Sequence, residues 1–181
     1  CMVVRDNAAG IYQGTWHAET CPERGRVAHH SFSYAESEVL RIVDVAARIA
    51  ERRQRRLTVV VKDGGIPTVS DLWRECATAI ARQREIELSF LNVDYAVYRM
   101  LHSPSELDVL VAPNMFGDLL IDLGGILTGS RGLTFSGNFA TTSAAVYQTN
   151  HGAAHDLTAS DRANPLGQID SLALLLRESF A

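Results

Sequence analysis

The sequence predicts an α/β protein, in which a sheet is flanked by helices. Two observations lead to this fold class. Segments with helical periodicity alternate with short apolar runs over the first 127 residues. In addition, Leu57 to Val61 is an unbroken, mostly β-branched run, as expected of a strand buried on both faces of a parallel sheet.

The remaining elements follow from the same patterns. Between residues 37 and 53, apolar residues recur at the spacing of an amphipathic helix. Ser33, followed three residues later by Glu36, predicts a capping box at the start of this helix. Elsewhere the patterns predict strands at 2–4, 86–93 and 107–111, and helices at 68–84, 95–101, 115–127 and 165–176.

Two stretches fit neither helical nor strand periodicity. Residues 10–32 are rich in Gly, Thr, His and Ser with scattered aromatic residues, which predicts a long arm or hairpin. Residues 129–154 have the composition of a loop.

Composition excludes several classes of function. The 181 residues are 46% apolar and 21% charged, with a net charge of -4 and dispersed charges, which argues against nucleic acid as a partner. No apolar run approaches the roughly 18 residues that a membrane span needs. Three cysteines without metal-ligand spacing indicate a reducing compartment, so we expect a cytoplasmic protein with neither membrane nor nucleic-acid partners.

The segment NMFGDLLIDLGG, at 114–125, is the most informative motif. It places Asp118 and Asp122 four residues apart on one face of a predicted helix. Two carboxylates at this spacing are either solvated or hold a cation, and hard oxygen ligands suit Mg²⁺ or Mn²⁺.

Two further polar residues follow predicted strands. Asp94 comes after a strand-like run and before a helix, where α/β proteins bind ligands, although an Asp there can also cap the helix. Lys62 ends the run LTVVV, so we expect partial desolvation that suits it to proton transfer; an exposed lysine at a strand end is the alternative.

The segment HGAAHD, at 151–156, predicts a loop of small residues before a helix. Gly152, Ala153 and Ala154 would let backbone amides approach a nucleotide closely. The residues alone therefore indicate an α/β protein with an acidic, potentially metal-binding site, without specifying a reaction.

Taken in order, these segments resemble the isopropylmalate/isocitrate dehydrogenase family of NAD-linked decarboxylating dehydrogenases, with NAD-linked 3-isopropylmalate dehydrogenase most similar. VVRDNAAGIYQG, at 3–14, is similar to the family segment in which an arginine binds substrate and a tyrosine donates a proton. The resemblance implies these site residues: Arg5 for substrate, Tyr12 and Lys62 for catalysis, Asp94, Asp118 and Asp122 for metal, and His151, Gly152, Ala153, Ala154, Asp156, Leu157 and Asn164 for NAD.

The resemblance implies an isopropylmalate dehydrogenase-like fold, incomplete at both ends, and a corresponding activity. Residues 1–127 would form the substrate, metal and dimerisation domain, with an arm at about 14–32, and residues 128–181 part of the NAD-binding domain. The expected reaction is the oxidative decarboxylation, dependent on Mg²⁺ or Mn²⁺, of a 3-substituted malate such as 3-isopropylmalate. A homodimer with shared active sites is implied, and the chain by itself is expected to be inactive.

Two alternatives stay open. A tartrate-, D-malate- or isocitrate-specific enzyme would carry the same motifs, because the residues that select the substrate side chain are not recognisable here. A non-catalytic or regulatory subunit is favoured by departures from the family pattern at Val61 and Asp63 to Gly65, which flank Lys62, and at Gln148 to Asn150 before His151.

Overall fold

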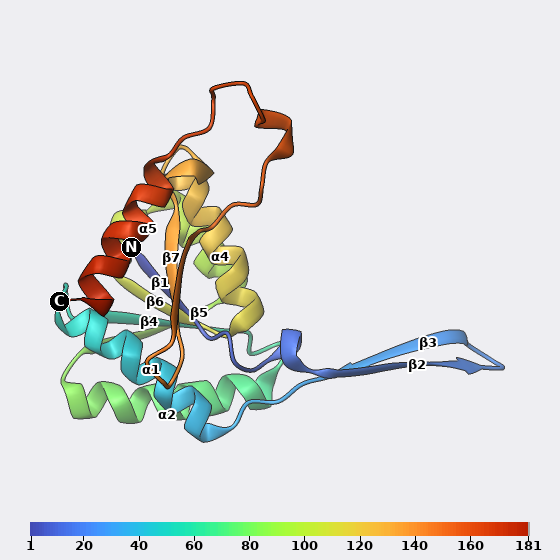
Figure 1. The fold of residues 1–181 in the computed structure, drawn as a ribbon. Helices are drawn as coiled ribbons and strands as arrows, with labels where there is room; N and C mark the ends of the chain where they lie inside the picture. Colours follow the sequence, from blue (N-terminus) through green and yellow to red (C-terminus); the bar gives the residue numbers. More distant parts are fainter. Residues whose placement is uncertain (181) are drawn as a thin grey trace. The chain divides into compact units, whose positions relative to one another are not determined.

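The computed structural model describes residues 1–180 of the chain, which divides into two compact units, Cys1–Leu120 and Ile121–Ala181. The first unit contains a four-stranded parallel sheet with the strand order β1-β6-β4-β5 (Figure 1). Its strands are β1 (Met2–Arg5), β4 (Arg56–Val61), β5 (Glu87–Asn92) and β6 (Val109–Ala112).

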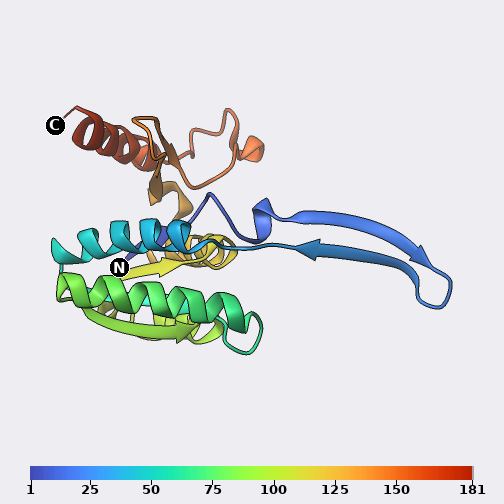
Figure 2. The same ribbon diagram turned by 90° about the horizontal axis from the view of Figure 1, so that it is seen from below.

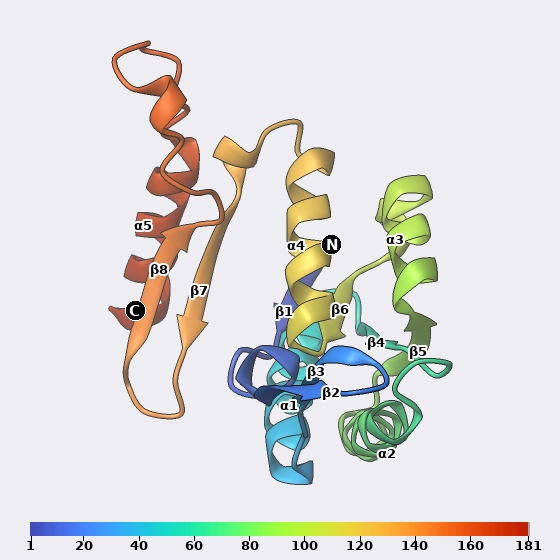
Figure 3. The same ribbon diagram turned by 90° about the vertical axis from the view of Figure 1, so that its right-hand side faces the viewer.

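Helices cover both faces of this sheet, which confirms the predicted fold class. α1 and α2 lie on one face, and α3 and the beginning of α4 lie on the other (Figure 3). The division between the two units falls inside α4. The helices are α1 (Glu36–Glu51), α2 (Pro67–Arg84), α3 (Val93–His102) and α4 (Asn114–Leu127), with a short 3-10 turn, η2 (Pro104–Glu106), before β6.

The core of the first unit lies between the sheet and helices α1 and α2. Every residue from Leu57 to Val61 is buried, as predicted for a strand covered on both faces. Burying one such Val or Leu side chain contributes roughly 1.5–3 kcal/mol, so this strand anchors the unit. α1 contributes the face Val39, Ile42, Val43, Ala46, Ala47 and Ala50, and α2 contributes Trp73, Cys76, Ala77 and Ala81.

The predicted capping box at Ser33 is wrong. α1 begins at Glu36, and the side chain of Glu38 accepts a hydrogen bond from the backbone N–H of Ala35 at 2.7 Å. Tyr34 explains the difference, because its ring packs edge-on against the buried Trp73 and its hydroxyl accepts a 2.9 Å hydrogen bond from the Asn114 backbone. These tertiary contacts fix the chain before the helix.

The stretch 10–32 forms an arm, as predicted. After a 3-10 turn, η1 (Ile11–Gln13), strands β2 (Thr15–Cys21) and β3 (Gly25–Ser31) pair as an antiparallel hairpin. Within the first unit the hairpin projects away from the sheet and its helices (Figures 1 and 2). Gly10 is required at its base, since its φ is +87° and an added Cβ would lie 2.1 Å from the Tyr34 hydroxyl oxygen.

The second unit is a small hairpin covered by one helix. Strands β7 (Phe135–Phe139) and β8 (Ala145–Thr149) pair antiparallel, and α5 (Leu166–Ser179) packs against both. The interpretation of 129–154 as a loop is therefore wrong over these strands. Ser136, Gly137 and Asn138 break the apolar alternation of a strand, and packing against α5 supplies the missing stability. Two 3-10 turns, η3 (Arg131–Leu133) and η4 (His155–Leu157), complete the unit.

Helix α4 continues into the second unit, and the remaining helix boundaries agree with the predicted ones within a few residues. Among residues 1–180, no helix combines the length and apolar character that crossing a membrane would require.

Candidate active site

The strands of the first unit bring several predicted residues to one edge of the sheet. Arg5 ends β1, Lys62 follows β4 and Asp94 follows β5. Because the four strands are parallel, their carboxyl ends meet at the same edge, which is where open α/β sheets bind ligands. The residues after β6, starting with Asn114, reach this edge too.

Arg5, Tyr12 and Asp118 are in direct contact. Nη1 of Arg5 donates to Oδ1 of Asp118 at 2.5 Å, and the Tyr12 hydroxyl donates to Oδ2 of the same carboxylate at 3.2 Å. The guanidinium of Arg5 also lies 5.8 Å from the centre of the Tyr12 ring. Two residues near the start of the sequence and one more than a hundred positions later thus form one cluster of a cation, a phenol and a carboxylate.

Asn114 positions Arg5, a role not predicted from the sequence. Its side-chain oxygen accepts bonds from Nε and Nη2 of Arg5 at 3.1 and 2.8 Å, and its amide nitrogen donates to the Ala9 carbonyl at 3.0 Å. Asn114 is 1% exposed, so these bonds form in a protected environment. Its place as the first residue of the NMFGDLLID motif, directly after a buried strand, was the available signal.

Gly117 allows α4 to approach Arg5. A Cβ added at this glycine would lie 2.7 Å from both Cβ and Cγ of Arg5, closer than side chains pack. A glycine is therefore needed at this position of the motif. Asp118 reaches the guanidinium only because α4 and Arg5 pack this tightly.

The phenol of Tyr12 is held in its protonated form. Partial burial, together with the hydrogen bond to Asp118 and the negative charge of that carboxylate, raises the pKa of Tyr12 above its ordinary value. The phenol is therefore protonated near neutral pH, and a catalytic role for Tyr12 stays a prediction. Burial likewise raises the pKa of nearby Tyr34 to about 12, so its hydroxyl stays neutral beside Asn114.

Lys62 and Asp94 form a second pair along the same sheet edge. The ammonium of Lys62 donates to Oδ1 of Asp94 at 2.7 Å, and this bond lowers the pKa of Asp94. The side chain of Lys62 is 39% exposed, so the expected desolvation is at most partial in this chain. Next to it, Asp63 is engaged by Arg74 at 2.8 Å, in the segment that departs from the family pattern.

The third predicted metal ligand, Asp122, lies in the second unit and contacts Arg131 at 2.7 Å. Each of the three predicted metal ligands is therefore paired with a cationic side chain: Asp94 with Lys62, Asp118 with Arg5, and Asp122 with Arg131.

The predicted NAD loop is exposed in the second unit. His151 contacts the carbonyl of Gly152 through Nδ1 at 2.9 Å, and Ala154 has a left-handed φ of +45° before the turn η4. A Cβ added at Gly152 would meet no atom within 4 Å, so the backbone there is accessible to a ligand. Asn164 accepts a bond from Leu166 N–H at 3.0 Å and so stabilises the beginning of α5, while Asp156 is exposed and Leu157 partly buried.

Known proteins resemble this chain over its whole length. The model of the isocitrate/isopropylmalate dehydrogenase family matches residues 1–181. The 3-isopropylmalate dehydrogenases of Synechococcus sp. (strain JA-3-3Ab) and Oleidesulfovibrio alaskensis are 40% and 39% identical to it over 99% of its length. These matches cover 47% and 50% of the two relatives, so the chain spans about half of their length.

A solved structure agrees with the sequence relatives. The crystal structure of isocitrate dehydrogenase from Methylococcus capsulatus superposes on 97% of this chain with a TM-score of 0.88 and 33% identity, and the match covers 52% of that structure. Sequence and structure therefore give the same result. The chain belongs to the isocitrate/isopropylmalate dehydrogenase family.

Proposed function

We propose that a protein carrying this chain catalyses the metal-dependent, NAD-linked oxidative decarboxylation of a 3-substituted malate such as 3-isopropylmalate. The observation that carries the proposal is the cluster of Arg5, Tyr12 and Asp118 at the sheet edge where Lys62 and Asp94 also lie. The relatives named 3-isopropylmalate dehydrogenase support this substrate class.

Arg5 would bind a substrate carboxylate. Its guanidinium is fixed by Asn114, so it loses little conformational freedom when a ligand arrives. A substrate carboxylate can take the place of Asp118 on Nη1, with the charge-assisted geometry that arginine provides. The side chain of Asp118 is 46% exposed, so it is free to turn toward solvent or toward a cation.

Tyr12 and Lys62 would handle protons. Tyr12 would donate its phenolic proton to the enol carbon formed after loss of CO₂, as the family resemblance implies. Lys62 would help remove the proton of the substrate 2-hydroxyl. By analogy with the family, Lys62 and Asp94 would serve the site of a second subunit.

The acids fit a hard divalent cation. Asp94, Asp118 and Asp122 offer the carboxylate oxygens that Mg²⁺ and Mn²⁺ prefer, and each is paired here with a cationic Lys or Arg side chain. When bound, such an ion would supply the Lewis acidity that polarises the 2-hydroxyl and the later carbonyl. The lowered pKa of Asp94 keeps it ionised and ready to bind.

NAD would supply the hydride acceptor and would bind to the second unit. Its adenosine end would contact His151, Gly152, Ala153, Ala154, Asp156, Leu157 and Asn164, which lie in or beside the exposed loop. Asp156 favours NAD over NADP, because a carboxylate suits ribose hydroxyls and repels a 2′-phosphate. We place the working enzyme in the cytoplasm, in keeping with its three free cysteines. The family resemblance implies that it is a homodimer with shared sites.

A chimera tests the proposal. The chain replaces the matching half of the 3-isopropylmalate dehydrogenase of Synechococcus sp., and NADH formation is followed with Mn²⁺ and 3-isopropylmalate, isocitrate, D-malate or tartrate. We expect turnover of at least one of these acids. Tyr12→Phe and Lys62→Met should each lower kcat by about 10²-fold or more, the usual size of an acid–base contribution. Tyr98→Phe, at an exposed tyrosine of α3, serves as the control and should leave kcat unchanged.

A non-catalytic or regulatory subunit is the second candidate. The ion pair of Asp63 with Arg74, in the segment that departs from the family pattern beside Lys62, favours it. A folded, dimeric chimera without turnover of any of the four acids would support this candidate and contradict the first.

A further inference from the structure

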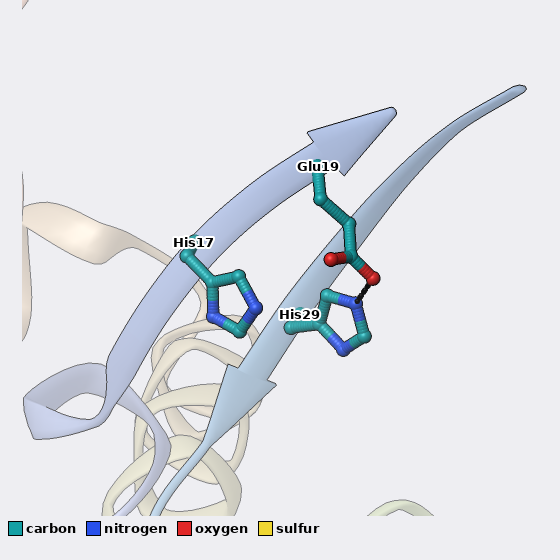
Figure 4. Close-up of side chains that lie close together, drawn as sticks. All are labelled: His17, Glu19 and His29. Atoms are coloured by element: carbon teal, nitrogen blue, oxygen red, sulfur yellow. Dashed lines mark hydrogen bonds and ion pairs between the residues drawn. The ribbon is translucent and has the colours of Figure 1, made fainter. Parts of the chain in front are cut away.

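The arm presents two histidines and a glutamate on one face. His17 and His29 are directly opposite each other in the β2–β3 register, and Glu19 follows His17 by two residues. Side chains two apart on a strand point to the same face, and directly opposed residues share that face. Figure 4 shows the three side chains together above the hairpin.

The potential ligand atoms of these side chains are close together. One ligand atom from each of His17, Glu19 and His29 lies within 4.8 Å of the other two. Nε2 of His29 is 3.1 Å from Oε1 of Glu19, and the two imidazole rings are stacked with centroids 4.5 Å apart. Two ligands of a tetrahedral Zn²⁺ are about 3.3 Å apart, given metal–ligand distances near 2.0–2.1 Å. The Glu19–His29 pair already has this spacing, and a rotation of the exposed His17 side chain would bring in the third ligand.

We propose that the arm binds one borderline-soft transition-metal ion, of the Zn²⁺ class, through His17, Glu19 and His29, with water completing the coordination. Imidazole nitrogens with one carboxylate suit Zn²⁺, Co²⁺, Ni²⁺ and Cu²⁺, whereas Mg²⁺ prefers oxygen ligands alone. This site differs in donor chemistry from the all-carboxylate set of the proposed reaction and does not depend on it.

Such an ion would link the two strands of the hairpin. All but two of its strand residues are exposed, the exceptions being the partly buried Cys21 and Val27. A two-stranded hairpin without a core is marginally stable in water. The ion would join β2 to β3, because His17 and Glu19 belong to one strand and His29 to the other. It would therefore hold the register of the arm and stiffen it.

Titration of the purified, chelator-treated chain with Zn²⁺, by calorimetry, tests the site. We expect one tightly bound ion per chain, and at least about tenfold weaker binding in His29→Asn and Glu19→Gln. Asp118→Asn should leave the Zn²⁺ affinity unchanged. His30→Asn is the matched control, since His30 is adjacent on β3 but points to the opposite face, toward Trp16. Far-UV circular dichroism verifies that each variant keeps its fold.

Co²⁺ provides a second readout at the proposed ligand itself. In His29→Cys a thiolate replaces the imidazole, so Co²⁺ should still bind and should gain a sulfur-to-metal charge-transfer absorption that the wild type lacks. Absence of Zn²⁺ binding to the wild type would overturn the proposal and leave a hydrogen-bonded His–Glu cluster. Equal loss of binding in His30→Asn and His29→Asn, or no new absorption with bound Co²⁺ in His29→Cys, would also overturn it.

Discussion

The two units of the chain differ in how much apolar surface they bury. In Cys1–Leu120, strand β4 is buried along most of its length between two layers of helices. In residues 121–180, the buried positions are Gly125, Gly167 and Ser171, and no large apolar side chain is fully buried. The apolar residues of α5 are exposed instead: Leu166, Ile169, Leu172 and Leu176. The first unit thus has a core of large apolar side chains, whereas the second fully buries only small residues.

Truncating one leucine in each unit should give the largest difference between the units in the loss of unfolding free energy. Leu57 is 1% exposed in β4, and Leu57→Ala should lower the free energy of unfolding by about 3 kcal/mol, because it removes buried contacts and leaves a cavity. Leu172 is 55% exposed in α5, and Leu172→Ala should change it by less than about 0.5 kcal/mol. Denaturant unfolding followed by circular dichroism measures both, and similar losses would break the comparison.

Removing the charge of a buried carboxylate in the first unit, Asp108, should give the next largest loss of stability. Burial alone would raise the pKa of Asp108, but hydrogen bonds from the Arg53 side chain and the Gln54 backbone outweigh it and hold the pKa below 3.8. Asp108→Asn should therefore cost about 2 kcal/mol near neutral pH.

The pH dependence of this effect has a definite sign. Because the folded-state pKa is lowered, the stabilisation by Asp108 is complete well above the ordinary value of 3.8 and is lost as the pH falls through the folded-state value. The difference in unfolding free energy between wild type and variant should shrink in acid. Asp170→Asn, at an exposed position of α5, is the control, and a constant difference from pH 7 to pH 2 would contradict the assignment.

A smaller loss of stability is expected when a side chain is added at Gly167, where the second unit is tightly packed. A Cβ added at Gly167 would lie 2.8 Å from the carbonyl oxygen of Gly132 and 3.0 Å from that of Thr134. Gly167→Ala should destabilise the second unit by about 1 kcal/mol, because backbone must shift. A Cβ at Gly124, in the part of α4 that belongs to this unit, meets no atom within 4 Å, so Gly124→Ala should be neutral or stabilising. Amide hydrogen exchange resolves both changes by region, and equal behaviour would show that this packing is not specific.

Local patterns predicted the first unit because its elements carry their own periodicity. The run from Leu57 to Val61 and the apolar stripe of α1 record burial directly in the sequence. The start of α1 was misplaced because Tyr34 is held by Trp73 and Asn114, which are distant in sequence. Strands β7 and β8 were missed because α5 stabilises them, and Gly137 interrupts their pattern.

The candidate site could be predicted only in part for the same reason. Motif spacing predicted Asp118 and the family resemblance predicted Arg5 and Tyr12 as site residues, and the structure adds their mutual contacts. The hydrogen bonds of Asn114 with Arg5 and of Arg131 with Asp122 depend on tertiary geometry and could not be predicted. The cluster of His17, Glu19 and His29 needed the strand register, which pairs residues 12 positions apart. His17 and Glu19 are two residues apart in the sequence, but only the hairpin brings His29 beside them.

Mn²⁺ binding by the chimeric enzyme tests the central claim most directly. Titration calorimetry compares two chimeras, one that keeps Asp118 and one that carries Asp118→Asn. Both also carry His29→Asn, which removes the arm site. We predict micromolar Mn²⁺ affinity with Asp118 and at least about tenfold weaker binding with Asp118→Asn, because one carboxylate ligand is lost. Equal affinity in both proteins, or no Mn²⁺ binding in either, would contradict a catalytic metal site on α4.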